Sequence, residues 1–432
     1  MKVRAIRIAA AAAAVVLSTG LLASCGSSDP EPSSVSADDV AGNIRFSWWG
    51  SESRNARTNA VIDLFQKKFP VKVEGEPVDY LKYFERLNVQ AAGGNMPCVT
   101  QMLTFGLNDY ASKDLFLDLS DSKLLDLSTV DKGVVDSLRA DDGALYMAPY
   151  GIAPSVIAYN TAMADKYGID IPGNSMTWGE FFSWMRQAQQ KLPKGVFAMD
   201  FPYNTPVEVI TYLGSRGPVF TAGKPAFRAE DLAGWFSTWH ELMDEGVVLP
   251  AERITDYTGS HEDSAMAAGV AFASARPANA LGAIANGLKS HGLAPDVGYT
   301  LLPVADDGKA TDLLPINGLS IPKSCDNVAS AMAFINFWIN DASANEAFAA
   351  DNGAPTVAAY RGKLQDAPET GASTKDMIKV ASEVVDRGSL AVDLPPKFQT
   401  TFLDAYRRVA ISAFTGATSA EAAAEEIISR MR

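Results

Sequence analysis

The chain has 432 residues, of which 47% are hydrophobic and 20% charged, with 51 Asp and Glu against 37 Lys and Arg. This acidic balance argues against nucleic acid, or an electrostatically bound membrane surface, as a partner. A chain of this length has too many apolar residues for a single core, so we expect two domains.

Residues 1–24 have the pattern of a secretory signal peptide. Lys2, Arg4 and Arg7 precede an uncharged, alanine-rich run that ends in the tetrapeptide LASC, at Cys25. A cationic end, a short apolar run and small residues at the cut are typical of export signals rather than of membrane spans. LASC resembles a bacterial lipobox, which implies cleavage before Cys25 and acylation of this cysteine. An ordinary cleaved signal, with Cys25 incidental, is the alternative.

Residues 25–42 form a tether by their composition. After Cys25 they read GSSDPEPSSVSADDVAG, which is polar, rich in Ser and Pro, and without apolar periodicity. Such a chain spans on the order of 20–25 Å. Without its leader, which holds three of the Lys and Arg and none of the Asp and Glu, the chain carries a net charge of −17. We expect an exported protein, anchored by lipid to the outer face of the cell membrane.

The next sixty residues alternate between strand and helix patterns. Strands are predicted at 43–50, 71–78 and 98–103, and helices at 61–69 and 80–92. This alternation is typical of βαβ units, and therefore of an α/β fold with a mostly parallel sheet flanked by helices. Ligands bind such sheets beyond the carboxyl ends of the strands.

The rest of the chain continues in the same style. Two capping boxes are predicted, Thr177 with Glu180 at the start of a helix that reaches Leu192, and Thr418 with Glu421 at the start of the terminal helix. Further strands are predicted at 145–150, 155–159, 269–275 and 317–322.

No catalytic or metal-binding motif is found. None of the three histidines has metal-ligand spacing, and the cluster from His261 to Asp263 is interpreted as a solvated helix start. Phosphate-loop, nucleophile-elbow and dinucleotide-binding patterns are also absent. We therefore predict no catalytic residue, metal or cofactor, although glycosidase carboxylates have no obligatory spacing.

Two adjacent tryptophans mark the end of the first predicted strand. Trp48 and Trp49 need a cover, which either a lobe interface or a ligand can supply. Indole rings stack on sugar C–H faces, and a planar guanidinium such as that of Arg54 binds hydroxyl pairs. From these residues alone, a ligand site and structural packing remain equally open.

The order of motifs along the chain resembles the extracellular solute-binding proteins of ABC sugar importers, the family that includes maltose-binding protein. No single motif is diagnostic, but their order behind a lipobox is specific. The matching segments are FSWWG (46–50) with Arg54, AVIDLFQKKFP (60–70), YFERLNVQAAGGNMP (83–97), GALYMAPY (143–150) with AYN (158–160), MTWGEF (176–181), GLSIP (318–322) and GAP (353–355).

This resemblance implies two α/β lobes joined by three chain crossings, with the ligand between them and closure by hinge motion. Lobe one is expected at 43–152 and 316–353, and lobe two at 153–315 and 354–432. The ligand-binding positions that it implies are Trp48, Trp49, Arg54, Thr104, Phe105, Tyr150, Tyr203, Asn204, Arg276, Asn317 and Gly318.

The function implied is that of a monomeric substrate-binding subunit, which captures a sugar or oligosaccharide and delivers it to membrane permease subunits without catalysing a reaction. Two alternatives remain. One is a secreted carbohydrate-active enzyme, and the other is the same scaffold with a non-sugar solute such as a peptide or a phosphodiester.

Cys98 and Cys325 remain once Cys25 is acylated, and cysteines in exported proteins are more often paired than free. The family usually has Asp where this chain has Cys98. The family topology implies that Cys98 begins the third strand and that Cys325 follows a neighbouring antiparallel strand, so we expect a disulfide between them.

Overall fold

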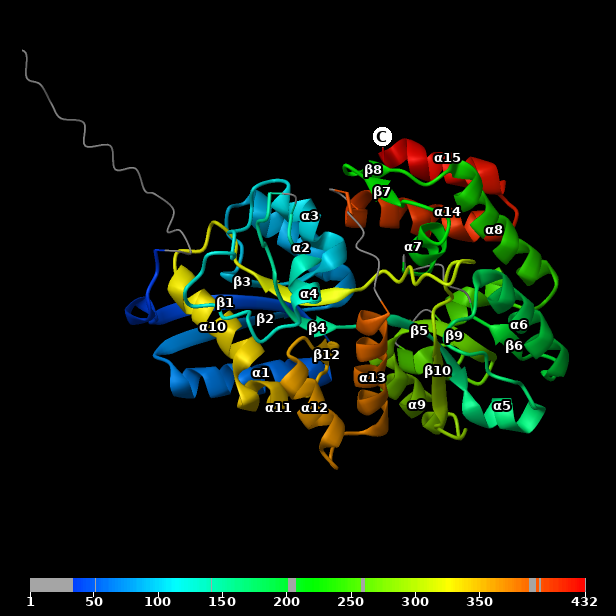
Figure 1. The fold of residues 1–432 in the computed structure, drawn as a ribbon, viewed down its shortest axis with the longest axis horizontal. Coiled ribbons are helices and arrows are strands. Elements are labelled where there is room, and N and C mark those ends of the chain that lie inside the picture. Colours follow the sequence, from blue (N-terminus) through cyan, green and yellow to red (C-terminus); the bar gives the residue numbers. More distant parts are fainter. Residues whose placement is uncertain are drawn as a thin grey trace, which may run out of the picture.

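The chain folds into two lobes that lie side by side in the computed structural model (Figure 1). The structure describes residues 34–431 except 51, 141, 201–206, 258–260, 388–393 and 396–397. The predicted signal peptide and Cys25 lie outside these residues. Among the residues described, no helix has both the length and the apolar character needed to cross a membrane.

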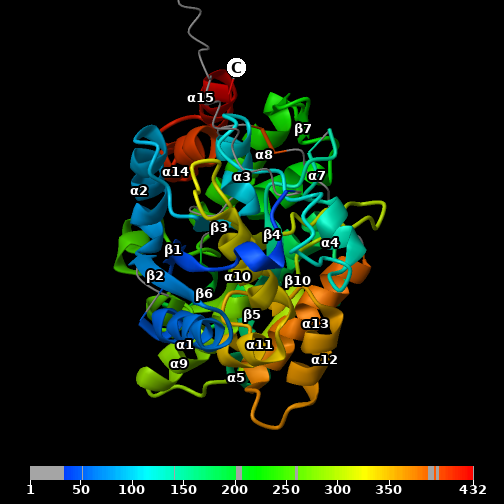
Figure 2. The same cartoon turned by 90° about the vertical axis from the view of Figure 1, so that its left-hand side faces the viewer.

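Lobe one is built on a six-stranded sheet of order β12-β4-β11-β3-β1-β2. Helices α1 and α2 lie on opposite sides of this sheet (Figures 1 and 2). The predicted ranges of β2 and α2 agree with the structure residue for residue. The first elements are β1 (Gly42–Trp49), α1 (Glu52–Lys68), β2 (Val71–Val78), α2 (Tyr80–Ala92), β3 (Val99–Leu103), α3 (Thr104–Ala111), α4 (Lys132–Asp136) and β4 (Ala148–Ile152).

The chain returns to lobe one after its excursion through lobe two. Strand β1 pairs in parallel with β2 and β3, as predicted, whereas the returning β11 lies antiparallel between β3 and β4. The sheet is therefore mixed. The returning elements are β11 (Ile316–Ser320), α10 (Val328–Asn340), α11 (Ala342–Phe348), β12 (Ala354–Pro355) and α12 (Ala358–Asp366).

Lobe two is built on a four-stranded sheet of order β10-β5-β9-β6. Its first elements are β5 (Ser155–Asn160), α5 (Thr161–Tyr167), α6 (Trp178–Lys191), β6 (Phe197–Met199), α7 (Val207–Gly214), β7 (Phe220–Thr221), β8 (Lys224–Pro225), α8 (Ala229–Asp244) and the 3₁₀ helix η2 (Ala251–Tyr257). The 3₁₀ helix η3 (His261–Asp263), β9 (Ala271–Pro277), the 3₁₀ helix η4 (Ala278–Ala280), α9 (Leu281–Ser290) and β10 (Val297–Leu301) follow.

The sheet of lobe two corrects the prediction of a mostly parallel sheet. Strand β5 leaves the first crossing, whereas β9 and β10 run back toward it, so that Ser155 pairs with Pro277. Both pairings of β5 are antiparallel, and only β6 and β9 pair in parallel. Strands that carry the chain away from and back to one crossing must run in opposite directions.

The C-terminal segment begins between the lobes and ends on lobe two (Figure 1). Helix α13 contacts β12 of lobe one as well as η4 and α9 of lobe two, while α14 and α15 pack on α8. These elements are α13 (Ala372–Asp386), the π-helix η5 (Phe398–Leu403), α14 (Asp404–Phe414) and α15 (Ala420–Met431).

One of the two predicted capping boxes is present. The Thr177 hydroxyl accepts the Glu180 backbone N–H, and the Glu180 carboxylate accepts the Thr177 backbone N–H at 2.8 Å. At α15, however, the hydroxyl of Ser419 accepts the backbone N–H of Ala422, so the cap lies one residue later than Thr418. The Thr418 backbone N–H instead bonds to the carbonyl of Ser412, in the last turn of α14.

The predicted disulfide is confirmed. Cys98 and Cys325 are bonded, with Cα atoms 4.7 Å apart and a sequence separation of 227. The register explains this proximity, because Thr100 near the start of β3 pairs with Ser320 at the end of β11. The bond therefore fastens the returning segment to the first part of lobe one.

Candidate functional site

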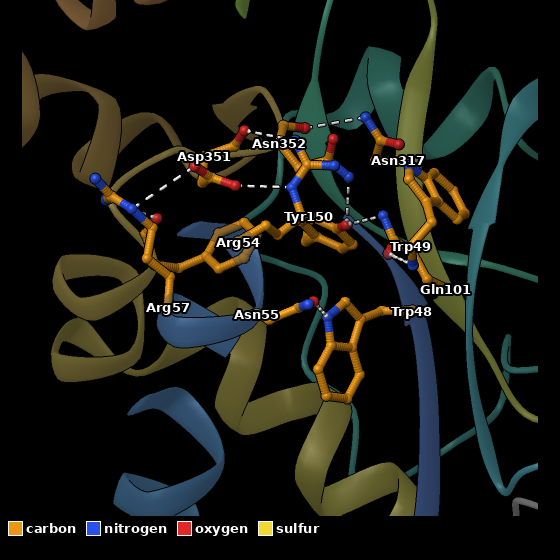
Figure 3. A network of polar contacts seen from close by, with 11 residues as sticks. Trp48, Trp49, Arg54, Asn55, Arg57, Gln101, Tyr150, Asn317, Asp351 and Asn352 are labelled. Atoms are coloured by element: carbon orange, nitrogen blue, oxygen red, sulfur yellow. Dashed lines mark hydrogen bonds and ion pairs between the residues drawn. The ribbon is translucent and has the colours of Figure 1, made fainter. Parts of the chain in front are cut away.

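Four polar side chains meet where the first two crossings leave and enter lobe one (Figure 3). Tyr150 lies in β4, just before the first crossing, and Asn317 lies in β11, just after the second. Asn352 stands two residues before β12, and Gln101 lies in β3. All four side chains belong to residues less than one-tenth exposed. Buried amides and phenols are stable only when they are hydrogen-bonded. Gln101 and Asn352 bond to Tyr150, and Asn317 bonds to the backbone carbonyl of Asn352.

The hydroxyl of Tyr150 is the centre of this network. It accepts hydrogen bonds from Gln101 Nε2 and Asn352 Nδ2, both at 2.9 Å. Burial raises the pKa of Tyr150 well above its ordinary value, so the hydroxyl keeps its proton. A phenol oxygen accepts up to two hydrogen bonds and donates one. Among the described residues, none accepts a hydrogen bond from the Tyr150 hydroxyl.

An arginine–carboxylate cluster borders the network in lobe one. Arg54 Nε donates to Asp351 Oδ2 at 2.7 Å, and Arg54 also donates to the Asp351 carbonyl at 3.1 Å. Arg57 approaches the other carboxylate oxygen at 3.6 Å. The side chains of Arg54 and Asp351 are only 17% and 20% exposed. This planar pair presents hydrogen-bond donors and acceptors together.

Lobe two contains a second arginine–carboxylate pair. Arg276, near the end of β9, donates through Nη2 to Asp200 Oδ2 at 2.6 Å and through Nε to the Ser274 hydroxyl at 2.7 Å. Asp200 directly follows β6, which pairs in parallel with β9, so this pair lies at the carboxyl ends of two parallel strands. Burial raises the pKa of Asp200, and the charge of Arg276 opposes this shift.

His261 connects the two halves electrostatically. Burial, together with the positive charges of Arg276 in lobe two and Arg54 in lobe one, lowers its pKa to about 4. Both guanidinium groups therefore lie within electrostatic range of the imidazole, which is neutral at physiological pH. A short helix does start at His261, as predicted; Glu262 and Asp263 are exposed, whereas His261 is only partly exposed.

Thr104 and Phe105 lie where lobe one meets other segments. The Thr104 hydroxyl donates to the carbonyl of Ile316 at 3.1 Å and accepts its N–H at 3.0 Å, at the second crossing. The ring of Phe105 lies 6.0 Å from that of Phe398 in the π-helix η5. Helix α3, which contains both residues, contacts this π-helix, so Phe105 is covered by protein across the interface.

The ligand role expected for Trp48 is corrected by its packing. The side chain is 1% exposed, its ring lies 5.0 Å from that of Phe46, and its Nε1 donates to Asn55 at 2.9 Å. A Cβ at Gly75 on the neighbouring strand would lie 2.7 Å from the indole, so this glycine makes room for it. Trp48 is a core residue of lobe one.

Trp49 points to the other face of the sheet, because successive strand residues alternate. Its ring packs edge-on against Tyr80 and Tyr83 of α2, and it is 5% exposed. Its backbone N–H donates to Gln101 Oε1 at 3.1 Å, which fixes the orientation of that amide. The side chain of Trp49 is thus packed against α2, and only its backbone N–H contacts the polar network.

Gly318 is also structural. A Cβ there would lie 2.3 Å from the side chain of Met147 and 2.7 Å from the carbonyl of Ala148. The pairing of β11 with β4 shifts register at this glycine. Close approach of two strands therefore accounts for it, in place of the expected ligand contact.

Tyr203 and Asn204 lie outside the described residues. Five further residues belong to the candidate site but were not predicted from the sequence. Three of them had a usable signal: Asp200 is a polar residue directly after a strand, and Asp351 and Asn352 belong to a DNG turn. These are Gln101, Asp200, His261, Asp351 and Asn352. Within the described ranges, no three metal-ligating side chains cluster closely enough to hold a metal ion.

A sequence profile of the family described as bacterial extracellular solute-binding protein matches residues 60–372. This match covers well over half of the chain. It begins in α1 and ends at the start of α13, so it includes Asp351 and the Arg276–Asp200 pair, whereas Arg54 lies just before it.

Solved structures share the fold across both lobes. An oligogalacturonide-binding protein of Yersinia enterocolitica, in complex with saturated digalacturonic acid, has 21% identity and a TM-score of 0.74, over 90% of this chain and 100% of that one. The GacH receptor of Streptomyces glaucescens, also solved with acarbose, has 18% identity and a TM-score of 0.73 over 90% and 97%. A Listeria monocytogenes ABC substrate-binding protein in complex with cycloalternan has 17% identity and a TM-score of 0.71 over 90% and 98%.

Proposed function

Because the chain belongs to the bacterial extracellular solute-binding proteins, we propose that it captures a carbohydrate between its lobes and delivers it to the permease of an ABC importer. The observation that carries this proposal is the pair of arginine–carboxylate groups, Arg54 with Asp351 and Arg276 with Asp200, one in each lobe. Because each lobe supplies one pair, a solute bound to both pairs would contact both lobes.

The chemistry of these groups suits a polyol. Each arginine–carboxylate pair offers N–H donors and carboxylate acceptors in a plane, which matches the alternating donors and acceptors of vicinal hydroxyls. The protonated Tyr150 adds one donor. The ligands of the similar structures, digalacturonic acid, acarbose and cycloalternan, are all carbohydrates, which supports this class.

A thermal-shift panel tests the proposal. The processed protein is melted with maltooligosaccharides, cycloalternan, digalacturonic acid, a peptide mixture and glycerophosphodiesters. A solute at 100 times its Kd stabilises the native state by about 2.7 kcal/mol, and this raises the melting temperature. A shift with at least one carbohydrate supports the proposal. A shift with only the peptides or phosphodiesters overturns the ligand class, and release of reducing sugar would identify an enzyme instead.

Closure supplies an independent measurement. A solute that contacts both lobes favours the conformation in which they are closest. Small-angle scattering at saturating sugar is expected to give a smaller radius of gyration than without sugar. An identical curve would argue against closure. The same measurement reports the mass in solution, for which we propose a monomer.

We further propose that the chain is anchored through an acylated Cys25. The LASC motif and the following polar tether support this. Cys25→Ala is expected to release the protein from the membrane fraction or leave it unprocessed, whereas Cys325→Ala, a control on a cysteine of the folded part, should leave anchoring unchanged. Full membrane retention of Cys25→Ala with normal processing would exclude the anchor.

The proposed lobes follow the predicted boundaries except at the third crossing. Ala354 and Pro355 form β12, which pairs with β4 of lobe one. We therefore assign 43–152 and 316–366 to lobe one, with the third crossing after α12. Lobe two then comprises 153–315 and the segment that begins with α13.

A further inference from the structure

The carboxyl ends of the three parallel strands of lobe one carry aromatic side chains. Trp49 ends β1, Tyr80 stands two residues after β2, and Phe105 stands two residues after β3. The rings of Trp49 and Tyr80 lie 5.7 Å apart. Ligands of open α/β sheets bind beyond this edge of the strands. A group that faces this edge from lobe two is therefore well placed to contact a solute.

The π-helix η5 faces this edge from lobe two. The ring of Phe398 lies 6.0 Å from that of Phe105, and η5 contacts the helix α3 that contains Phe105. Within lobe two, the rings of Phe402 and Phe220 lie 5.2 and 5.8 Å from that of Phe398 and hold it in place. Turns of π-helix are rare and are frequent at functional sites. The geometry of η5 thus gives a reason to search its polar side chains for a ligand contact.

Gln399, the second residue of η5, has a buried acceptor without a partner. The residue is 8% exposed, and no group in the described part of the chain donates to its Oε1. Burial raises the pKa of Tyr80, whereas the charge of Arg407 and hydrogen bonds with Arg407 and Gln399 oppose this rise. A neighbour lowers the pKa of a phenol by donating to its oxygen. The amide NH₂ of Gln399 is therefore the group that faces Tyr80 of lobe one, and its Oε1 is left over.

A buried acceptor without a donor lowers stability, because its lost hydration is not replaced, and native structures retain few such groups. Gln399 lies at the boundary between the lobes, where Tyr80 and Phe105 belong to lobe one and η5 to lobe two. Hinge motion separates the lobes of such folds, so it is expected to uncover Gln399 to a solute between them. A hydroxyl of that solute can donate to Oε1 while its C–H face packs on the neighbouring rings.

We propose that Gln399 is a specificity-determining residue that accepts a hydrogen bond from one hydroxyl of the solute. This inference rests on the proposed function, because the donor is a hydroxyl of the carbohydrate. The contact discriminates between sugars, since an analogue without that hydroxyl leaves Oε1 buried and unpaired in the complex. Gln399 thus adds selection for one hydroxyl position to the binding by the two arginine–carboxylate pairs.

Calorimetry with the sugar that gives the largest shift in the thermal panel, and with each of its monodeoxy analogues, tests the inference. Gln399→Met keeps the length of the side chain and removes the acceptor, so it is expected to bind the sugar about tenfold more weakly, the effect of one hydrogen bond. Wild-type protein should bind one monodeoxy analogue about tenfold more weakly than the sugar, whereas Gln399→Met should bind both equally. Equal discrimination by the two proteins would overturn the inference.

Gln90→Met is the matched control. Gln90 Oε1 is likewise buried without a described partner, and Gln90 Nε2 donates to Glu76 Oε2 at 3.2 Å within lobe one. This variant should leave affinity and discrimination unchanged. A lower melting temperature of Gln399→Met with unchanged affinity would assign Gln399 to structure and overturn the inference alone. If no carbohydrate shifts the wild-type protein, the proposed function fails and this inference fails with it.

Discussion

Each lobe contains one arginine–carboxylate pair, but the two pairs are carried by different kinds of structural element. In lobe two, Arg276 and Asp200 stand at the ends of paired strands, and the hydroxyl of Ser274 completes their contacts. In lobe one, Arg54 and Asp351 depend on a helix start and on a turn with left-handed alanines, which borders the chain crossings. The lobe-two half is part of a sheet, whereas the lobe-one half is part of the hinge.

Because of this difference, we expect the two pairs to behave differently when the lobes move. A pair on a sheet edge keeps its geometry when the lobes move, because the strands beneath it are held by backbone hydrogen bonds. A pair that borders the crossings is expected to shift when the conformation of the crossings changes. Substitutions in lobe two should therefore affect affinity alone, whereas those in lobe one should also affect stability or closure.

The largest effect is expected from the disulfide, which lobe one has and the described part of lobe two lacks. Replacing both Cys98 and Cys325 by Ser reopens a loop of 227 residues, for which the loop-entropy relation gives an upper value of about 5 kcal/mol. Urea unfolding should show this loss. Wild-type protein measured with reductant is the control and should match the double variant; an unchanged midpoint in both would remove the disulfide from the stability of lobe one.

Trp48→Ala should follow in size. Truncating a fully buried aromatic side chain costs about 3–5 kcal/mol through lost contacts and the cavity left behind. The expected result is a lower free energy of unfolding, read by circular dichroism. Val89→Ala, at a 74% exposed position of α2 in the same lobe, is the control and should have little effect. If Trp48→Ala keeps full stability and only weakens sugar binding, the assignment of Trp48 to the core is wrong.

Lowering the pH should decrease the free energy of unfolding because of His261. The native imidazole stays neutral down to pH about 4, whereas the unfolded one binds a proton below about 6.5, so the unfolded state holds more protons in between. Stability should therefore fall as the pH falls from 6.5 to 4, by about 3 kcal/mol in all. His261→Gln should lose this slope while other groups titrate unchanged. Equal slopes in both proteins would place His261 in solvent.

The smallest effects should separate the two arginine–carboxylate pairs. Asp200→Asn is expected to weaken the sugar identified by the panel about tenfold, because Arg276 loses its orienting charge, and to change stability little, because burial already opposes the ionised carboxylate. Asp351→Asn should weaken binding similarly and also destabilise the protein, because it releases the turn before β12. Calorimetry and melting on both variants measure this, and identical stability losses would contradict the comparison.

The sequence by itself determined the local elements and their order. Alternating apolar residues mark β1 and β2, and Pro70 and the diglycine after Ala92 end α1 and α2, because local sterics and periodicity fix strand and helix boundaries. The disulfide between Cys98 and Cys325 could also be predicted from the sequence, once the family resemblance supplied the strand order. These properties depend on few residues at a time, or on the topology.

Only the tertiary structure decided which of these residues are covered by other side chains and which meet in a hydrogen-bond network. Trp48 and Trp49 are adjacent in sequence but point to opposite faces of β1, and both are covered by side chains whose positions depend on how the lobe packs. Asn352 reaches Tyr150 only because β12 pairs with β4. Burial and hydrogen-bond partners of this kind arise from contacts between segments remote in sequence, for which local patterns carry no signal.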